Sequence, residues 1–175
     1  MKIAISGKSG CGNSTVSRIV AKRLGYKLVN YTFHSTAQEI GVSFDEMCEM
    51  AEQDDKWDLY VDERQVEMAR EGNTVLGSRL AIWVLEDADF RVYLDARMEV
   101  RSTRIQKREG GELDQISAKT ARRDRRDHDR YLRLYDIDNN NFKFVDLVVD
   151  TEDMTPEEIA DLIIESSGAR PAAIR

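Results

Sequence analysis

The sequence has little of the residues that build disulfide frameworks or histidine-rich metal sites. Its 175 residues include two cysteines, two histidines and two prolines. Cys11 and Cys48 do not have the spacing of metal ligands, so we expect a reducing, cytoplasmic environment. His34 and His128 are too few for a histidine-rich metal site. The chemistry of this chain must therefore be sought in other residue types.

Long hydrophobic runs are also missing. No run approaches the roughly 20 apolar residues that a membrane-spanning helix needs. Only three apolar residues separate Lys2 from Ser6, so we expect neither a signal peptide nor a membrane span. The formal net charge of −7 argues against a protein that coats nucleic acid or an anionic membrane. The length predicts a single domain with a sizeable core.

Short apolar runs alternate with amphipathic segments along the chain. We expect strands at residues 2–6, 27–30, 73–77, 90–96 and 146–151. We expect helices at residues 13–24, 36–40, 44–51, 57–70, 80–86, 97–108, 113–135 and 155–166. This alternation predicts an α/β fold with a mainly parallel sheet of five strands covered by helices on both faces. The last residues, 168–175, are expected to be frayed.

The stretch GKSGCGNS, residues 7–14, ends the first expected strand and opens the first expected helix. This order is the context of a phosphate-binding loop, in which glycines let backbone N–H groups point at phosphate oxygens. The helix dipole behind the loop adds to that attraction. Ser14 offers a hydroxyl to Mg²⁺, and a glycine-rich turn without a ligand is the alternative. The residues expected to hold the nucleotide are Gly7, Ser9, Gly10, Cys11, Gly12, Asn13, Ser14 and Thr15.

Asn13 stands where a phosphate-binding loop usually carries a lysine. An amide can donate a hydrogen bond to phosphate, but such a neutral bond contributes about 1 kcal/mol against about 1.5–3 for a charge-assisted one. We therefore expect a deficit of about one to two powers of ten in binding or rate unless another residue brings charge. Lys8 could do so, since a divergent class of phosphate-loop ATPases uses a lysine at that place in a GKGGxGK pattern. The arginines of the long helix at 113–135 are a second source, and a solvated loop lysine is the alternative for Lys8.

The segment KTARRDRRDHDRYLR, residues 119–133, has seven basic and three acidic residues in a chain that is acidic overall. Arg123, Arg126 and Arg130 lie on one face of the expected helix, with Asp127 beside them. The segment could be a lid that closes over a polyphosphate, a nucleic-acid-binding helix, or a solvated helix laced with Arg–Asp pairs. The phosphate loop favours the lid, because phosphoryl transfer needs mobile positive charge that also excludes water.

These motifs occur in an order that resembles cytidylate kinases of the short type found in archaea and some bacteria, within the P-loop nucleoside-monophosphate kinases. The resemblance runs from Met1 to about Glu165. It rests on the phosphate loop, DLYVDERQVEMAREGNTVLGSRLAIW (58–83), YLDARMEVRSTRIQKREG (93–110), RRDRRDHDRY (122–131) and VDTEDMTPEEIADLI (149–163). It implies a three-layer P-loop NTPase sandwich. The implied parts are a core at 1–31, 73–110 and 141–167, a helical acceptor-binding insertion at about 32–72, and an arginine-rich lid at about 111–140.

The resemblance also implies roles for single residues on the acceptor side. Arg79 matches the arginine of the family's GR motif, which grips the acceptor monophosphate, although it could instead cap a neighbouring helix. Asp62 and Arg64 match a D-x-R placement in the acceptor-binding helices, although they could be an ordinary exposed pair. His34 stands where these kinases usually carry an arginine after Phe. It would bind the acceptor phosphate when protonated, or have no essential role.

In the lid, Arg123, Asp127 and Arg130 match the family pattern R-x-x-R-D-x-x-R. In that pattern the arginines bridge the two phosphates and the aspartate faces the acceptor. We therefore expect the catalytic charges to come from Lys8 of the phosphate loop and from Arg123, Arg126 and Arg130 of the lid.

The implied activity is transfer of the γ-phosphoryl group of ATP, with Mg²⁺ bound at Ser14, to CMP or dCMP. Three alternatives stay open: a kinase for another nucleotide or small metabolite, a catalytically weak nucleotide-binding protein, and an RNA-binding protein, which the net acidity disfavours. We expect a monomeric cytoplasmic enzyme whose partners are small molecules rather than nucleic acid or membrane.

Overall fold

A computed structural model describes residues 1–172 of the chain. At its centre lies a five-stranded sheet in the order β2-β3-β1-β4-β5, and every neighbouring pair is parallel. The strands are β1 (Lys2–Gly7), β2 (Lys27–Val29), β3 (Thr74–Gly77), β4 (Phe90–Asp95) and β5 (Leu147–Asp150). The expected parallel α/β sheet is confirmed, and each strand ends within one residue of its predicted bounds.

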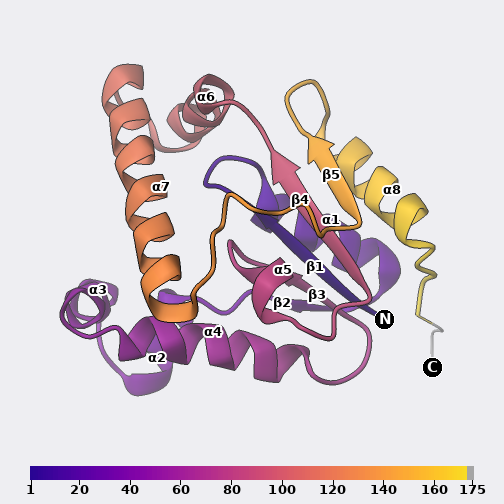
Figure 1. Ribbon diagram of the computed structural model, residues 1–175, viewed down its shortest axis with the longest axis horizontal. Coiled ribbons are helices and arrows are strands. Elements are labelled where there is room, and N and C mark those ends of the chain that lie inside the picture. Colours follow the sequence, from indigo (N-terminus) through magenta and orange to yellow (C-terminus); the bar gives the residue numbers. More distant parts are fainter. Residues whose placement is uncertain (173–175) are drawn as a thin grey trace.

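Helices cover both faces of this sheet (Figure 1). They are α1 (Asn13–Leu24), α2 (Phe33–Ile40), α3 (Phe44–Gln53), α4 (Lys56–Ala69), α5 (Ala81–Val84), α6 (Met98–Glu109), α7 (Leu113–Tyr135) and α8 (Pro156–Ser167). Successive residues of β1 point to opposite faces, so Ile3 and Ile5 join one core and Ala4 joins the other. The first core packs against α1 and α8, and the second packs against α4 and α5.

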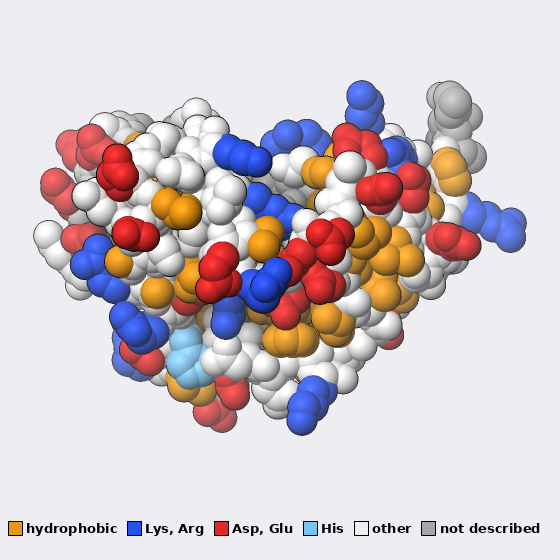
Figure 2. Space-filling view, turned by 90° about the horizontal axis from the view of Figure 1, so that it is seen from above, with side chains coloured by type: hydrophobic (Ala, Val, Ile, Leu, Met, Phe, Trp, Pro, Cys, Tyr) orange, Lys and Arg blue, Asp and Glu red, His pale blue; other side chains and the backbone are white. Residues whose placement is uncertain are grey.

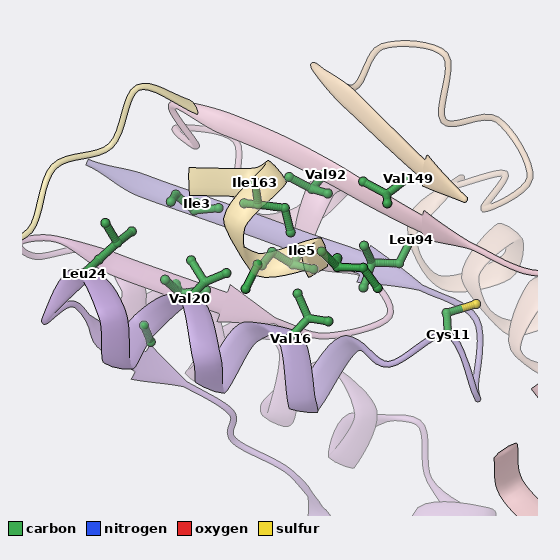
Figure 3. Close-up of a cluster of buried hydrophobic side chains, with 14 of the residues drawn as sticks. Ile3, Ile5, Cys11, Val16, Val20, Leu24, Val92, Leu94, Val149 and Ile163 are labelled. Carbon is green, nitrogen blue, oxygen red and sulfur yellow. The ribbon is translucent and has the colours of Figure 1, made fainter. Parts of the chain in front are cut away.

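The first core extends to the phosphate loop. Figure 3 shows side chains of β1, β4 and β5 facing those of α1 and α8. Cys11 lies at the end of this cluster and is only 2% exposed, so its thiol anchors the loop in the core. Burial raises the pKa of Cys11 to about 11, which keeps the thiol neutral at physiological pH. The loop is thus held from below by an apolar contact.

The helices α2, α3 and α4 form a group beside the carboxyl edge of the sheet, and α7 runs past that group toward α6 (Figure 1). The group of α2, α3 and α4 covers the part of the sequence for which we predict the acceptor-binding insertion, and α7 covers most of the predicted lid. Arg133 of α7 forms an ion pair with Asp55 at the start of α4. The predicted lid helix and the predicted insertion are therefore in contact in this structure.

The segment expected to be frayed from residue 168 is held in place up to Ala172. The Tyr26 hydroxyl donates to the carbonyl of Arg170 at 3.1 Å, and the backbone N–H of Ala172 donates to the carbonyl of Leu24 at 2.7 Å. The rest of the predicted tail, 173–175, lies outside the described residues. In the part of the chain that the structure describes, no helix has both the length and the apolar character that crossing a bilayer requires.

Candidate active site

A cavity of about 610 Å³ opens at the carboxyl edge of the sheet. Its wall is made by the phosphate loop (8–15), by residues 30–33 after β2, by residues 77–80 at the end of β3, by side chains of α4, α6 and α7, and by Met154 and the start of α8. Ligands of open parallel sheets bind at this edge, because the loops that follow the strands converge there. Figure 2 views the molecule from this side and shows Lys and Arg side chains near the middle of the face.

The phosphate loop has the shape that anion binding requires. Gly10 and Gly12 have φ angles of 90° and 103°, which glycine alone adopts without strain. A Cβ atom on Gly10 would also lie 2.8 Å from the carbonyl oxygen of Arg101. Within residues 1–172 the backbone N–H groups of Gly10, Gly12, Asn13 and Ser14 find no hydrogen-bond acceptor. These open donors fit a phosphate group.

Asn13 does not replace the missing lysine in this arrangement. Its amide nitrogen donates to the carbonyl oxygen of Gly7, at the opposite end of the loop. Its amide oxygen is buried and has no partner among the described residues. A Cβ atom on Gly7 would lie 2.7 Å from that oxygen, so the amide is packed directly against Gly7. Asn13 thus closes the base of the loop instead of offering its side chain to a ligand.

The loop also fits a magnesium ion that arrives with a nucleotide. Ser14 is exposed, lines the cavity, and its hydroxyl has no hydrogen-bond partner within the described part of the chain. Mg²⁺ usually takes one or two protein ligands and completes its shell with phosphate oxygens and water. Residues 1–172 contain no cluster of three or more acidic, histidine or cysteine side chains that could hold a metal by itself. A single hydroxyl ligand beside a phosphate site is consistent with the way in which Mg²⁺ is bound together with a nucleotide.

On the side of the phosphate loop, two cations contact only neutral groups. Lys8 Nζ donates to the amide oxygen of Asn140 at 2.9 Å. Arg104 of α6 donates to the hydroxyl of Thr151 at 2.8 Å, to the carbonyl of Thr151, and to the carbonyl of Gly10 at 3.5 Å. Both side chains line the cavity. Their positive charges therefore remain uncompensated where a polyphosphate would lie.

Arg101 ties the phosphate loop to α6 and α7. Its side chain is 5% exposed, donates to the carbonyl of Ser9 at 3.1 Å, and forms an ion pair with Asp124 of α7 at 2.8 Å. A buried guanidinium with this fork of contacts fixes the position of the loop relative to both helices.

On the acceptor side, the arginines are paired with carboxylates. Arg79 follows β3 and forms an ion pair with Asp127 of α7, a residue that is 4% exposed. Arg130 contacts Asp58 of α4 at 2.7 Å and Asp127 at 3.4 Å. Burial raises the pKa of Asp58 although Arg130 opposes the shift. These ion pairs join α4, α7 and the end of β3.

Asp62 differs from the other acidic residues of the cavity because no arginine is paired with it in the described structure. It accepts a hydrogen bond from the hydroxyl of Tyr135 at 2.6 Å. Burial raises the pKa of Asp62 to about 6.

Arg123 of α7 also lines the cavity. The cavity thus brings together the phosphate loop, with Lys8, and five other predicted site residues, which are Asp62, Arg79, Arg123, Asp127 and Arg130, all but Asp127 at its wall.

Besides Gly7 and Asp127, three predicted site residues lie outside the cavity wall. Arg64 forms ion pairs with Glu67 at 2.6 Å and with Glu39 at 3.9 Å. The exposed ring of His34 stacks on Phe44, with 3.6 Å between the ring centroids. Arg126 is exposed on α7 and forms no ion pair with the residues described.

Sequence reasoning missed four residues of the site: Asp58, Arg101, Arg104 and Arg108. The three arginines belong to α6, where Arg101, Arg104 and Arg108 follow one another at spacings of three and four, so they share one helical face. That spacing was a usable signal for a second basic helix at the site. Asp58 had no comparable signal, because its importance comes from contact with Arg130, which is distant in the sequence.

Comparison with known proteins gives a consistent result. The profile of the Cytidylate kinase-like family matches residues 2–153. The chain is 47% identical over 167 residues to cytidylate kinase 2 of Borreliella burgdorferi, covering 93% of each protein. It is 39% identical over 163 residues to the cytidylate kinase of Pyrococcus abyssi, covering 92% of this chain and 90% of that protein.

Solved structures with a similar fold are P-loop kinases of low sequence identity. Shikimate kinase from Acinetobacter baumannii, in complex with shikimate, gives a TM-score of 0.63 at 17% identity and covers 94% of this chain and 90% of that one. Deoxyadenosine kinase from M. mycoides with bound dATP gives a TM-score of 0.57 at 18% identity and covers 96% of this chain and 100% of that one. These likenesses show the P-loop kinase fold.

Proposed function

The chain belongs to the cytidylate kinase-like family, and on that premise we propose that it transfers the γ-phosphoryl group of ATP to CMP or dCMP. The relatives support a nucleoside-monophosphate kinase, and the choice of a cytidine acceptor follows their names. The observation that carries the proposal is the single cavity that joins an open phosphate loop to Arg79 and to the arginines of α7.

In the proposed reaction an oxygen of the acceptor monophosphate attacks the γ-phosphorus of ATP. The new P–O bond forms as the bond between the γ-phosphorus and the β,γ-bridging oxygen breaks, which leaves ADP and a nucleoside diphosphate. The attacking oxygen is already anionic, so no side chain has to remove a proton. Mg²⁺ bound with ATP at Ser14 would neutralise charge on the β- and γ-phosphates.

The donor half of the site, around the phosphate loop, holds ATP in this proposal. The free N–H groups of the loop bind the β-phosphate, because they have no acceptor within residues 1–172 and lie at the start of α1. Lys8 and Arg104 supply positive charge that no carboxylate cancels. We infer that Lys8 takes over the function of the lysine that is absent at position 13, since the amide of Asn13 is used within the loop.

The acceptor half, around Arg79, holds the monophosphate. Arg79 binds the acceptor phosphate, which competes with Asp127 for the guanidinium. Arg123 and Arg130 stabilise the transferring group from α7. We propose that residues 32–72 and 111–140 close over the substrates as insertion and lid, and that closure brings Arg126, His34 and Arg64 nearer to the acceptor. The enzyme is further proposed to be a cytoplasmic monomer with small-molecule substrates only.

The test is to incubate the protein with Mg-ATP and a panel of nucleoside monophosphates and to follow diphosphate formation. Turnover with CMP or dCMP supports the proposal, and turnover with a different acceptor alone moves the substrate. ATP binding without phosphorylation of any acceptor would overturn the kinase function and leave a nucleotide-binding protein. The matched variant is Arg79→Ala, which removes the acceptor ligand and leaves the phosphate loop intact.

A further inference from the structure

Lys8 is held by a segment that follows the lid helix. Its ammonium group donates to the amide oxygen of Asn140, 132 residues further along the chain, at 2.9 Å. Asn140 lies in a tight turn after α7, in which the Asp138 carboxylate accepts from the Asn140 N–H at 2.9 Å and the Asp138 carbonyl accepts from the Asn141 N–H at 3.0 Å. Figure 1 shows this segment rising beside the loop that follows β1.

The other end of the Asn140 amide faces α7. Its nitrogen lies 3.2 Å from Nδ1 of His128, a residue in the middle of that helix. The same ring nitrogen lies 2.8 Å from the amide oxygen of Asn139, which is 8% exposed, and 3.7 Å from the Asp138 carboxylate. The ring nitrogen cannot donate to Asn139 and accept from Asn140 at once, so the direction of the Asn140 amide is fixed by Lys8. The ammonium group only donates, and the amide oxygen therefore faces it.

An amide oxygen is a suitable partner for a lysine that must act on phosphate. The ammonium group has three N–H donors, so one bond to Asn140 leaves two for phosphate oxygens. Because the amide is neutral, it orients the ammonium group and leaves its charge intact. A carboxylate at this place would cancel that charge, as Asp127 and Asp58 do for the arginines on the acceptor side.

We propose that Asn140 is a positioning residue for phosphoryl transfer: it aims the Lys8 ammonium group at the phosphates of ATP, from a turn that lies against His128 of α7. This inference rests on the proposed function. It also gives the lid a second effect. Since His128 belongs to α7 and Asn140 follows it, the helix that covers the acceptor also sets the position of the donor-side lysine.

The experiment compares steady-state kinetics of wild type, Asn140→Ala, Lys8→Ala and the double variant. We expect Lys8→Ala to lower kcat about tenfold to a hundredfold and Asn140→Ala to lower it about threefold to tenfold, in line with loss of a charged hydrogen bond. In the Lys8→Ala background, Asn140→Ala should change kcat less than about twofold, because both act through one ammonium group. Asn141→Ala, next to Asn140 and equally exposed, is the matched control and should match wild type.

Asn140→Asp separates positioning from structure. The new side chain has nearly the same shape but neutralises Lys8, so we expect kcat at or below that of Asn140→Ala and a raised KM for ATP. Wild-type kinetics for Asn140→Asp, or equal losses from Asn140→Ala with and without Lys8, would overturn the proposal. If the wild type phosphorylates no acceptor, the proposed function fails instead. The same cycle is then measured on Mg-ATP affinity by calorimetry, where independent effects of Lys8 and Asn140 would overturn the inference.

Discussion

The two halves of the cavity treat positive charge differently. On the donor side, Lys8 and Arg104 contact amide, hydroxyl and carbonyl oxygens, so their charges are free to attract a polyphosphate. On the acceptor side, Arg79 and Arg130 are paired with the buried carboxylates of Asp127 and Asp58, so the charges of these two arginines are compensated before a substrate binds. The difference implies that loss of a donor-side cation costs attraction for ATP. Loss of an acceptor-side cation also leaves a buried carboxylate without a partner.

The largest effect is expected from Arg79→Ala. The variant loses the ligand of the acceptor phosphate, and we expect kcat/KM for the acceptor to fall about a thousandfold, with a much smaller change in the KM for ATP. It also leaves Asp127, 4% exposed, without its main partner, so the free energy of unfolding should fall by about 3 kcal/mol.

The control for Arg79→Ala is the double variant Arg79→Ala/Asp127→Ala. It removes the carboxylate that has lost Arg79, so the free energy of unfolding should rise above that of the single variant while activity stays low. Steady-state kinetics and urea unfolding measure the two effects separately. A rise in the KM for ATP with no change in kcat/KM for the acceptor would mean that Arg79 acts in the donor half, contrary to the proposal.

Arg101 is the donor-side exception, because it is buried and paired with a carboxylate. For Arg101→Met we expect the free energy of unfolding to fall by about 3 kcal/mol, since Asp124 then lacks its partner and Ser9 loses its hydrogen bond. The KM for ATP should rise as the loop loses its anchor.

Arg97→Met is the matched control for Arg101→Met in the same helical region. Its ion pair with Glu152 is formed by a side chain that is 75% exposed, so we expect a change below about 1 kcal/mol. Thermal or urea unfolding of both variants checks the comparison. Equal losses would mean that burial of the pair does not decide its contribution.

The sheet and the phosphate loop could be predicted because their signals are local. Each strand is a short apolar run, and Gly10 and Gly12 stand at the turn that needs their positive φ angles. The pairing of charges could not be predicted in the same way. Lys8 and Asn140, or Arg79 and Asp127, are joined only by the tertiary fold, so no spacing in the sequence links them.

The inward direction of Asn13 was equally hidden from the sequence. It follows from the close approach of Gly7 and the strand beside it, where a Cβ atom on Gly7 would lie 2.4 Å from the carbonyl oxygen of Leu94. The predicted roles of His34 and Arg64 came from the family resemblance alone, and that of Arg126 came from its spacing with Arg123 and Arg130 on one helical face. They stay predictions, because their side chains lie outside the wall of the cavity in this conformation.

A lysine at position 13 tests where the donor-side charge comes from. In the wild-type background we expect Asn13→Lys to change kcat less than about threefold, because Lys8 already supplies the charge. In the Lys8→Ala background, Asn13→Lys should raise kcat about tenfold relative to Lys8→Ala alone, because one charge-assisted hydrogen bond is regained. Loss of the bond from Asn13 to Gly7 should lower the free energy of unfolding by about 1 kcal/mol in both backgrounds.

Asn13→Ala is the control, since it loses the same bond and brings no charge. It should lower stability as Asn13→Lys does and restore no activity in the absence of Lys8. A large rise in kcat from Asn13→Lys in the wild-type background would show that the donor half lacks positive charge. The contrast drawn between the two halves would then be wrong.

The smallest effect is expected at Asp62, the acceptor-side carboxylate that accepts a hydrogen bond from Tyr135 instead of pairing with an arginine. Burial raises its pKa from an ordinary value near 3.9 to about 6, so the folded protein binds this proton more tightly than the unfolded chain does. Its contribution to stability is therefore complete below about pH 4 and is lost as the pH rises through about 6.

Asp62→Asn removes this titration while keeping an acceptor for Tyr135. Relative to wild type, the free energy of unfolding of the variant should rise by roughly 1 kcal/mol between pH 4 and 7, since Asp62 is only partly buried and solvent screens it. Urea unfolding at a series of pH values measures the difference. Tyr135→Phe sharpens it: the hydroxyl of Tyr135 lowers the pKa of Asp62, so its removal should move the window to higher pH. If wild type and Asp62→Asn keep the same pH dependence, folding does not raise the pKa of Asp62, and the expectation from its burial is wrong.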